Sequence, residues 1–363
     1  MNMSIFERDT CMKPKLFFFS VILISQFAAS AQNYLDYHRE ILQAEKLFFV
    51  RQFDSSIHSY KKIFTKYSKP FAKDCYIALQ FAAMRKDTAS ATLFFMKAFE
   101  NGVRWNDLSM GFQVRELLGN AEYKKRISLL YPIYRQKYLH NINYAIRDSV
   151  EQMIVRDNQA GILTNQAFFK SKIHRNNKLQ YEVTDTAIVH VYDRNLAEII
   201  RISKRYGFPG QHLIGLLDPE LEQHDIREEH FELITLILLY HHYCSYFFLK
   251  NELLTALKNG ELLPTEYAMV YQWSYDAGYY NKNLGKPKAS NTLYHFGIQC
   301  DYSPPDKIYN HFTNPWYYSK DSAFVNKCRS EIGMQSLQHE MAKKMFARRN
   351  DIVFDFGYMN TIQ

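Results

Sequence analysis

Two consecutive helix–turn–helix patterns near the start of the chain constrain its fold more than any other feature. Between residues 36 and 102, apolar side chains recur at the spacing of one helical face, and the pattern breaks at 52–54 and again at 86–87. Pro70 separates the two pairs, and the pattern repeats after 35 residues. We therefore predict two helical hairpins in this part of the chain.

Small and aromatic residues at interlocking positions of the two hairpins resemble a tetratricopeptide repeat, whose period is 34. The family's central glycine, expected before Phe53, is missing. Two or three such repeats bury a core only by stacking on a neighbour. The resemblance therefore implies a unit at 32–130 that packs on the rest of the chain and either braces it or binds a peptide or protein. The matching residues are Ala44, Phe53, Ser56, Ile57, Tyr60 and Ile63, then Ala83, Ala91, Phe95 and Ala98.

The first 31 residues have the pattern of an export signal. Lys13 and Lys15 precede an apolar run from Leu16 to Ala28, and 29–31 is a small-residue cleavage site. Residues 1–11 differ from a signal's charged start, so Met12 is an alternative to Met1 as the first residue. We expect a periplasmic or secreted protein without stable membrane insertion after cleavage.

Residues 231–249 form a second apolar run. This run contains Glu232, His241 and His242, which are expensive at the depth of a bilayer. A helix buried in a protein core is therefore the better interpretation. The aromatic content of 16% likewise favours a core rich in Phe and Tyr over a dedicated stacking surface.

Positive charge is concentrated on the first unit. Residues 32–137 contain 18 Lys and Arg against 10 Asp and Glu, whereas residues 138–363 contain 24 against 25. A basic exported unit suits an acidic protein, an anionic surface or an acidic polymer, and the export signal disfavours nucleic acid. An ordinary solvated lysine-rich face is the plainer alternative.

From Pro132 onward the pattern predicts a second, irregular helical domain at 131–337, followed by a tail at 338–363. We expect one helix from Tyr144 that ends at 157–159 and another that begins near 185–186. The second helix should stop at a turn formed by Gly207, Pro209 and Gly210. A long helix is expected from Glu228 to Leu249, then a shorter one to Lys258, and Pro264 opens a further one.

The order of short motifs in this second part resembles a bacterial domain of unknown function found in exported proteins. The match covers roughly residues 144–337. Asn158 replaces the family's Gln, Phe296 replaces its Tyr, and Gln272-Trp273 stands where the family often has Asp-Arg. The matching residues are Asp157, Asp193, Asn195, 207–210, Gly215, His241 or His242, 260–264, 296–297, Gln299 and 332–334.

The candidate pocket in the second part consists of Asp157, Asp193, Asn195, His241 and His242. One of the histidines is a conceivable general base beside an aspartate, although adjacent helical residues point about 100° apart and cannot both serve one site.

Two further candidate sites, a metal site and a disulfide, have weaker signals. His224, Glu228 and His230 lack the H-E-x-x-H pattern of a metal helix, so neither a metal nor a cofactor is predicted. Cys300 and Cys328 are the cysteine pair to test for a disulfide.

The sequence thus predicts an all-α protein, with tetratricopeptide-like hairpins packed on a larger irregular helical domain. The favoured function is a protein-interaction module of the cell envelope, acting through the basic repeat unit, rather than an enzyme. The alternative is an envelope hydrolase or lyase that uses the Asp, Asn and His pocket.

Overall fold

The computed structural model describes residues 33–173, 178–221, 233–242, 245–271, 274 and 322–354; within 164–187 and at 322 and 324 only the backbone is described. These residues contain helices and no strand, which confirms the all-α class for the described part. The described residues from Asn33 onward belong to one compact unit. The predicted export signal at 1–31 lies outside the described residues.

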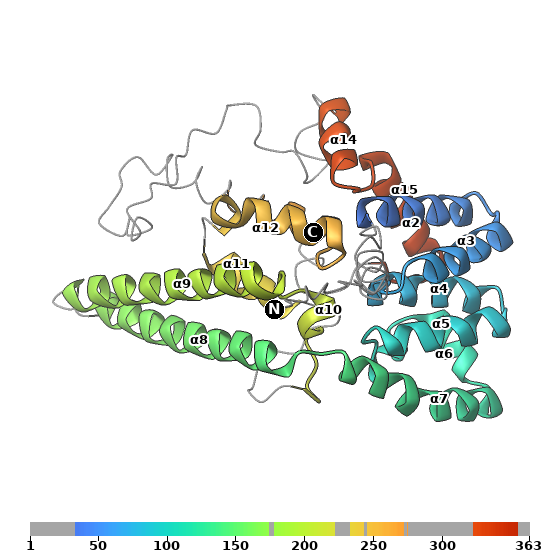
Figure 1. Ribbon diagram of the computed structural model, residues 1–363, viewed down its shortest axis with the longest axis horizontal. Helices are drawn as coiled ribbons and strands as arrows, with labels where there is room; N and C mark the ends of the chain where they lie inside the picture. Colours follow the sequence, from blue (N-terminus) through green and yellow to red (C-terminus); the bar gives the residue numbers. More distant parts are fainter. Residues whose placement is uncertain are drawn as a thin grey trace, which may run out of the picture. The chain divides into compact units, whose positions relative to one another are not determined.

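The N-terminal part is a stack of antiparallel helices (Figure 1). Helix α2 (Tyr34–Phe49) pairs with α3 (Phe53–Lys66), and α4 (Ala72–Met84) pairs with α5 (Thr88–Glu100). A 3-10 turn, η1 (Asn106–Ser109), and a short helix, α6 (Phe112–Leu118), lead to α7 (Ala121–His140), which packs on α5 and α6. The two predicted hairpins are present, with helix boundaries close to those expected.

Polar caps and left-handed turns set these boundaries. The side chain of Asp87 accepts a hydrogen bond from the backbone N–H of Ser90 at 3.0 Å, and Asn120 accepts one from Tyr123 at 2.9 Å. Gly102 has φ of +107°, a conformation that most side chains avoid. A Cβ at Gly102 would also lie 2.8 Å from the ring of Tyr138, so the turn after α5 requires glycine.

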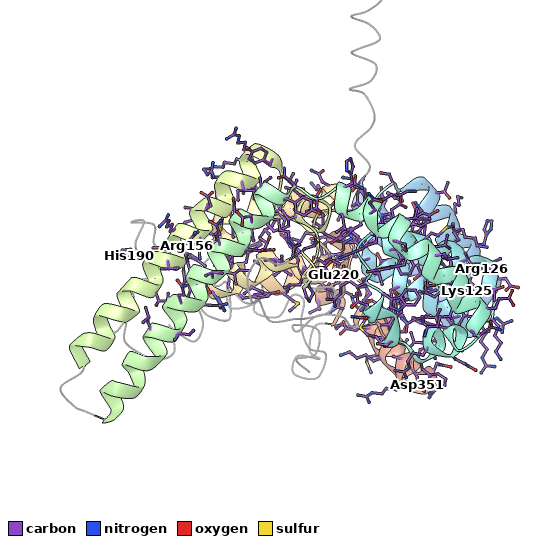
Figure 2. All side chains as sticks on the ribbon, turned by 90° about the horizontal axis from the view of Figure 1, so that it is seen from below. Lys125, Arg126, Arg156, His190, Glu220 and Asp351 are labelled. Atoms are coloured by element: carbon purple, nitrogen blue, oxygen red, sulfur yellow. The ribbon has the colours of Figure 1, made fainter. Side chains whose placement is uncertain are left out.

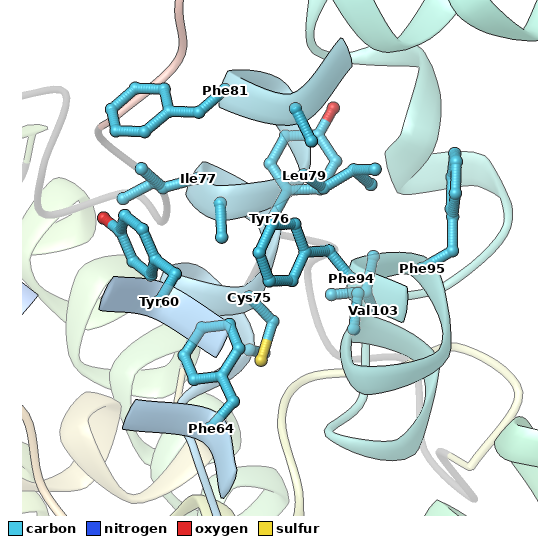
Figure 3. Close-up of a cluster of buried hydrophobic side chains, with 14 of the residues drawn as sticks. Tyr60, Phe64, Cys75, Tyr76, Ile77, Leu79, Phe81, Phe94, Phe95 and Val103 are labelled. Carbon is cyan, nitrogen blue, oxygen red and sulfur yellow. The ribbon is translucent and has the colours of Figure 1, made fainter. Parts of the chain in front are cut away.

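Aromatic rings fill the core of the hairpin stack, as predicted (Figure 3). The rings of Phe48 and Phe81 are stacked 3.6 Å apart, and Tyr60 and Phe94 meet edge to face near them. Cys75 is buried in the same cluster, as expected of a small apolar residue. The packing of these rings fixes the positions of helices α2 to α5 against one another.

Helix α7 is continuous from Ala121 to His140, with Pro132 inside it. The break predicted at Pro132 is therefore wrong, and the expected boundary between residues 130 and 131 falls within this helix. Pro132 is exposed, while Tyr123, Ile127 and Tyr138 are buried on the other side. The buried contacts of α7 outweigh the local cost of a proline in a helix.

The second part begins with two long helices, α8 (Tyr144–Ile173) and α9 (Lys178–Tyr206), which lie side by side (Figure 1). The predicted end of the first helix at 157–159 is wrong, because α8 runs through these residues. The predicted start of the next helix at 185–186 is also wrong, since α9 begins earlier. The stop at Gly207 is confirmed, with φ of +91°.

The helix predicted from Glu228 to Leu249 is interrupted. Helix α11 (Ile234–His241) is followed by His242, which has extended backbone angles, and α12 (Ser245–Asn259) comes next. A short helix, α10 (Gln211–Ile214), precedes them, and residues 264–271 are helical. In the part of the chain that is described, no helix has the length and hydrophobicity needed to cross a membrane.

The C-terminal segment packs on the N-terminal hairpins. Helix α14 (Ser322–Glu331) precedes α15 (Leu337–Asn350), so the segment expected as a tail is helical to Asn350, and α15 packs on α2. The amide of Gln80 donates to the carbonyl of Val353 at 2.7 Å and accepts from its N–H at 2.8 Å. The C-terminal segment therefore packs on the hairpins formed by the start of the described chain.

Candidate functional site

A glycine-rich turn positions helix α11 (Ile234–His241), at whose end the two candidate histidines lie. Gly207, Pro209 and Gly210 connect α9 to α10, as the sequence predicted, and the hydroxyl of Thr235 in α11 donates to the carbonyl of Pro209 at 2.6 Å. A Cβ at Gly210 would lie 2.0 Å from the carbonyl oxygen of Glu261. The turn thus tolerates no side chain at Gly210 and anchors the first turn of α11.

The two candidate aspartates lie on neighbouring helices, Asp157 on α8 and Asp193 on α9, and both are buried. The side chain of Asn195 donates to the carbonyl of Met153 at 3.2 Å, which ties α9 to α8. Asn195 also accepts from the guanidinium of Arg156 at 3.4 Å. Asn195 therefore serves the packing of the two helices.

His241, the last residue of α11, contacts Asp157 through its Nδ1 atom. The side chain of Asp157 is 2% exposed, whereas that of His241 is 42% exposed. The ring of Tyr192, on α9, lies 5.7 Å from the imidazole of His241. The arrangement places a buried carboxylate behind one ring nitrogen and leaves part of the imidazole at the surface.

His242 forms a separate pair with Asp193, whose carboxylate lies 3.0 Å from Nε2. Both side chains are buried, and the ring of His242 meets Phe248 edge to face. The second oxygen of Asp193 is buried without a hydrogen-bond partner among the described residues. The five candidate residues thus form two distinct Asp–His pairs and one structural asparagine, rather than one pocket.

The sequence interpretation missed two features near these residues. Tyr192, beside His241, gave no signal, because a tyrosine in a buried helix is ordinary. Arg147 is fully buried and donates to Glu151 at 2.7 Å and to the carbonyls of Ile214 and Leu216 at 2.9 and 2.8 Å. It fixes the chain that follows α10, a role visible only in three dimensions.

Several other candidates lie outside the described residues: His224, Glu228, His230, Phe296, Gly297, Gln299 and Cys300. Cys328, the proposed partner of Cys300, is half-buried, and burial raises the pKa of its thiol. Within the described stretches, no three His, Cys, Asp or Glu side chains are grouped to hold a metal ion.

The hairpin stack carries a groove of about 570 Å³ at the end where the α4–α5 turn meets α6 and the start of α7. Lys86, Glu116, Tyr123 and Arg126 are among its lining residues. The guanidinium of Arg126 lies 4.9 Å from the ring of Tyr123 and donates to Thr92 at 3.1 Å. The groove is therefore lined by basic and acidic side chains alike, with Arg126 held in place on α7.

Comparisons with protein-family models, with curated proteins and with solved structures found no match for this chain.

Proposed function

We propose that this chain is an exported helical protein of the cell envelope that binds an acidic segment of a protein partner on the outer face of α7. The hairpins α2–α3 and α4–α5, followed by α7, are proposed as tetratricopeptide-like repeats. Residues 144–337 are proposed as the bacterial domain of unknown function that their motif order resembles. The hairpin stack then serves as the recognition unit, and the second part supports it.

The observation that carries the proposal is the character of the exposed side of α7. Leu129 and Ile133 are 65% and 54% exposed, one helical turn apart, although the opposite side of the helix is buried in the hairpin core. Pro132 lies between them and is also exposed. An uncovered apolar stripe of this kind suits contact with another protein.

Charge selects the kind of partner. Lys125 and Arg126 are exposed beside the stripe (Figure 2). Lys137 is exposed further along the helix, and Glu122 is the nearest acidic residue in α7. The first unit as a whole has 18 basic against 10 acidic residues between 32 and 137. An acidic segment with apolar anchors complements both features, because opposite charges steer association while apolar side chains hold the complex.

The binding face can be tested by charge reversal with a matched control. Tagged full-length chain is purified from native envelopes beside the variant Lys125→Glu/Lys137→Glu. The control variant, Lys204→Glu/Lys250→Glu, makes the same charge change at exposed positions on α9 and α12. We expect one partner to be retained by the wild type and the control, lost by the α7 variant, and released as salt rises.

Retention of the partner by the α7 variant, or equal loss from the control, would contradict the proposal. Vesicles of anionic phospholipid provide the second arm. If they bind the wild type and not the α7 variant, the face meets a membrane surface and the protein partner is wrong.

A further inference from the structure

The groove on the hairpin stack shares a face of α7 with the exposed apolar stripe. Glu122 and Arg126 line the groove and are four residues apart, and Leu129 and Ile133 follow Arg126 by three and seven residues. Residues at this spacing lie on one side of a helix. All four side chains are exposed. The groove and the stripe therefore form one continuous surface, about 16 Å long at about 1.5 Å per residue.

The floor of the groove contains a hydrogen-bond acceptor that lacks a partner. Gln113 lines the groove and is 7% exposed, and its Nε2 atom donates to the carbonyl of Asn350, the last residue of α15. A carbonyl only accepts, so the amide nitrogen of Gln113 must face it. The other amide atom, Oε1, has no partner among the described residues. A ligand N–H would recover the free energy that this unmade hydrogen bond costs.

The rim of the groove carries charges of both signs. Lys86, in the turn between α4 and α5, and Arg126, on α7, are exposed lining residues, and so are Glu116 and Glu122. A small inorganic anion would meet two carboxylates as well as two cations, so the mixed rim disfavours it. The main chain of a peptide carries donors and acceptors together and suits such a lining. The volume of about 570 Å³ is also in the range of ligand sites.

Lys86 occupies a backbone position that favours glycine. Its φ is +54°, and it follows α4 where the N–H of Lys86 donates to Ala83 and that of Asp87 donates to Ala82. Glycine is the usual residue at this position after a helix. Arg51 has the same role in the turn after α2, with φ of +63°, and it does not line the groove. Glycine can therefore replace either side chain without strain, which gives a matched pair of variants.

We propose that the groove takes the main chain of an acidic peptide segment, with a carboxylate between Lys86 and Arg126 and a main-chain N–H donated to Oε1 of Gln113. This inference rests on the binding face proposed on α7, which it extends to α6 and the α4–α5 turn. A surface about 16 Å long matches about five residues of extended chain at about 3.3 Å per residue. Apolar side chains of the same segment then contact Leu129 and Ile133.

The groove is tested with immobilised full-length chain and two pools of acetylated pentapeptide amides. One pool has glutamate at its centre and the other glutamine, with random uncharged residues on either side. We expect the wild type to retain the glutamate pool about fivefold better, near the upper limit for a partly exposed ion pair. Lys86→Gly should abolish this preference, whereas Arg51→Gly should leave it unchanged. Equal retention of the two pools by the wild type, retention of neither, or an unchanged preference in Lys86→Gly would overturn the proposal.

Two further measurements separate the groove from the stripe. In nitrogen-15 NMR, the side-chain amide signals of Gln113, identified by their loss in Gln113→Met, should shift with both pools, because both carry main-chain N–H groups. Unshifted signals would overturn the contact with Oε1. In native envelopes, a partner lost by Lys125→Glu/Lys137→Glu but held by Lys86→Gly as firmly as by the wild type would overturn the groove alone. A wild type without any partner would contradict the α7 face itself.

Discussion

At the scale of single residues, the charge of the Glu261 carboxylate depends on its burial and on its missing hydrogen-bond partners. One carboxylate oxygen of Glu261 is buried without a hydrogen-bond partner among the described residues. Burial raises the pKa of Glu261 to about 7, against the opposing effects of Lys69 and the backbone N–H of His212. The folded protein therefore holds this side chain neutral under mildly acidic conditions.

This protonation makes the free energy of unfolding depend on pH. The pKa of Glu261 is about 7 when folded and near its ordinary value of 4.5 when unfolded. The stabilising contribution is thus complete below about pH 4.5 and is lost as pH rises through about 7. Because glutamine does not ionise, Glu261→Gln should remove this loss. The free energy of unfolding of the variant, relative to that of the wild type, should therefore rise by about 1–3 kcal/mol from about pH 5 to about pH 8. Urea unfolding at both pH values measures this gain.

The buried histidines His38 and His212 act in the opposite direction. Burial lowers the pKa of each to about 3, so each costs stability as pH falls below about 6.5. Both histidines are present in the wild type and in Glu261→Gln. Their contributions to the free energy of unfolding therefore cancel when the two proteins are compared at the same pH. An equal pH dependence in the two proteins would show that Glu261 is already charged in the fold.

At the scale of elements, a buried ion pair attaches α15 to α2. The ammonium of Lys343 lies 2.7 Å from the carboxylate of Glu45, and His339 lies 3.3 Å from its other oxygen. Although burial opposes ionisation, Lys343 and His339 together lower the pKa of Glu45. Glu45 and Lys343 therefore form an ion pair, in which the charge of each side chain is stabilised by the other.

Removal of one partner should therefore be costly. Lys343→Met leaves the carboxylate of Glu45 buried without its main counter-charge, and we expect a loss of about 3–5 kcal/mol in the free energy of unfolding. Adding Glu45→Gln to that variant should recover part of the loss. Lys344→Met, at a half-exposed lysine 3.6 Å from Glu340, should cost less than about 1 kcal/mol. A large loss in this control, or none in Lys343→Met, would contradict the assignment.

Sequence pattern predicted elements well where local signals decide them. The hairpin turns and the stop at Gly207 follow from caps and from residues suited to a left-handed backbone. The pattern failed where tertiary contacts override local preference. The polar residues at 157–159 suggested a helix end, yet α8 continues, because Asp157 is buried against α11. Pro132 suggested a break for the same local reason.

At the scale of the whole molecule, the sequence identified the polar residues of the candidate site but not their grouping. Which aspartate meets which histidine depends on where α11 ends and on how α8 and α9 lie beside it. Neither follows from spacing along the chain. The half-exposed position of His241 and the structural role of Asn195 became visible only with the helices assembled.

The hairpins and the rest of the chain also share buried charges. Arg135 of α7 contacts Asp218, beyond α10, and both side chains are buried. Glu45 and Lys343 join the two ends of the described chain in the same way. A chain shortened to begin at Tyr138 would leave Asp218 and Lys343 buried without these partners. Point variants are therefore the appropriate way to test binding by the hairpin unit.

The most direct test of the account is a photo-crosslinking residue at position 129 on the exposed side of α7. The control position is Ile162 on α8, which is 57% exposed, similar to Leu129 at 65%. In native envelopes, we predict one dominant adduct from position 129, absent from position 162 and abolished by Lys125→Glu/Lys137→Glu. The same adducts from both positions, or none from position 129, would show that α7 is not the binding face.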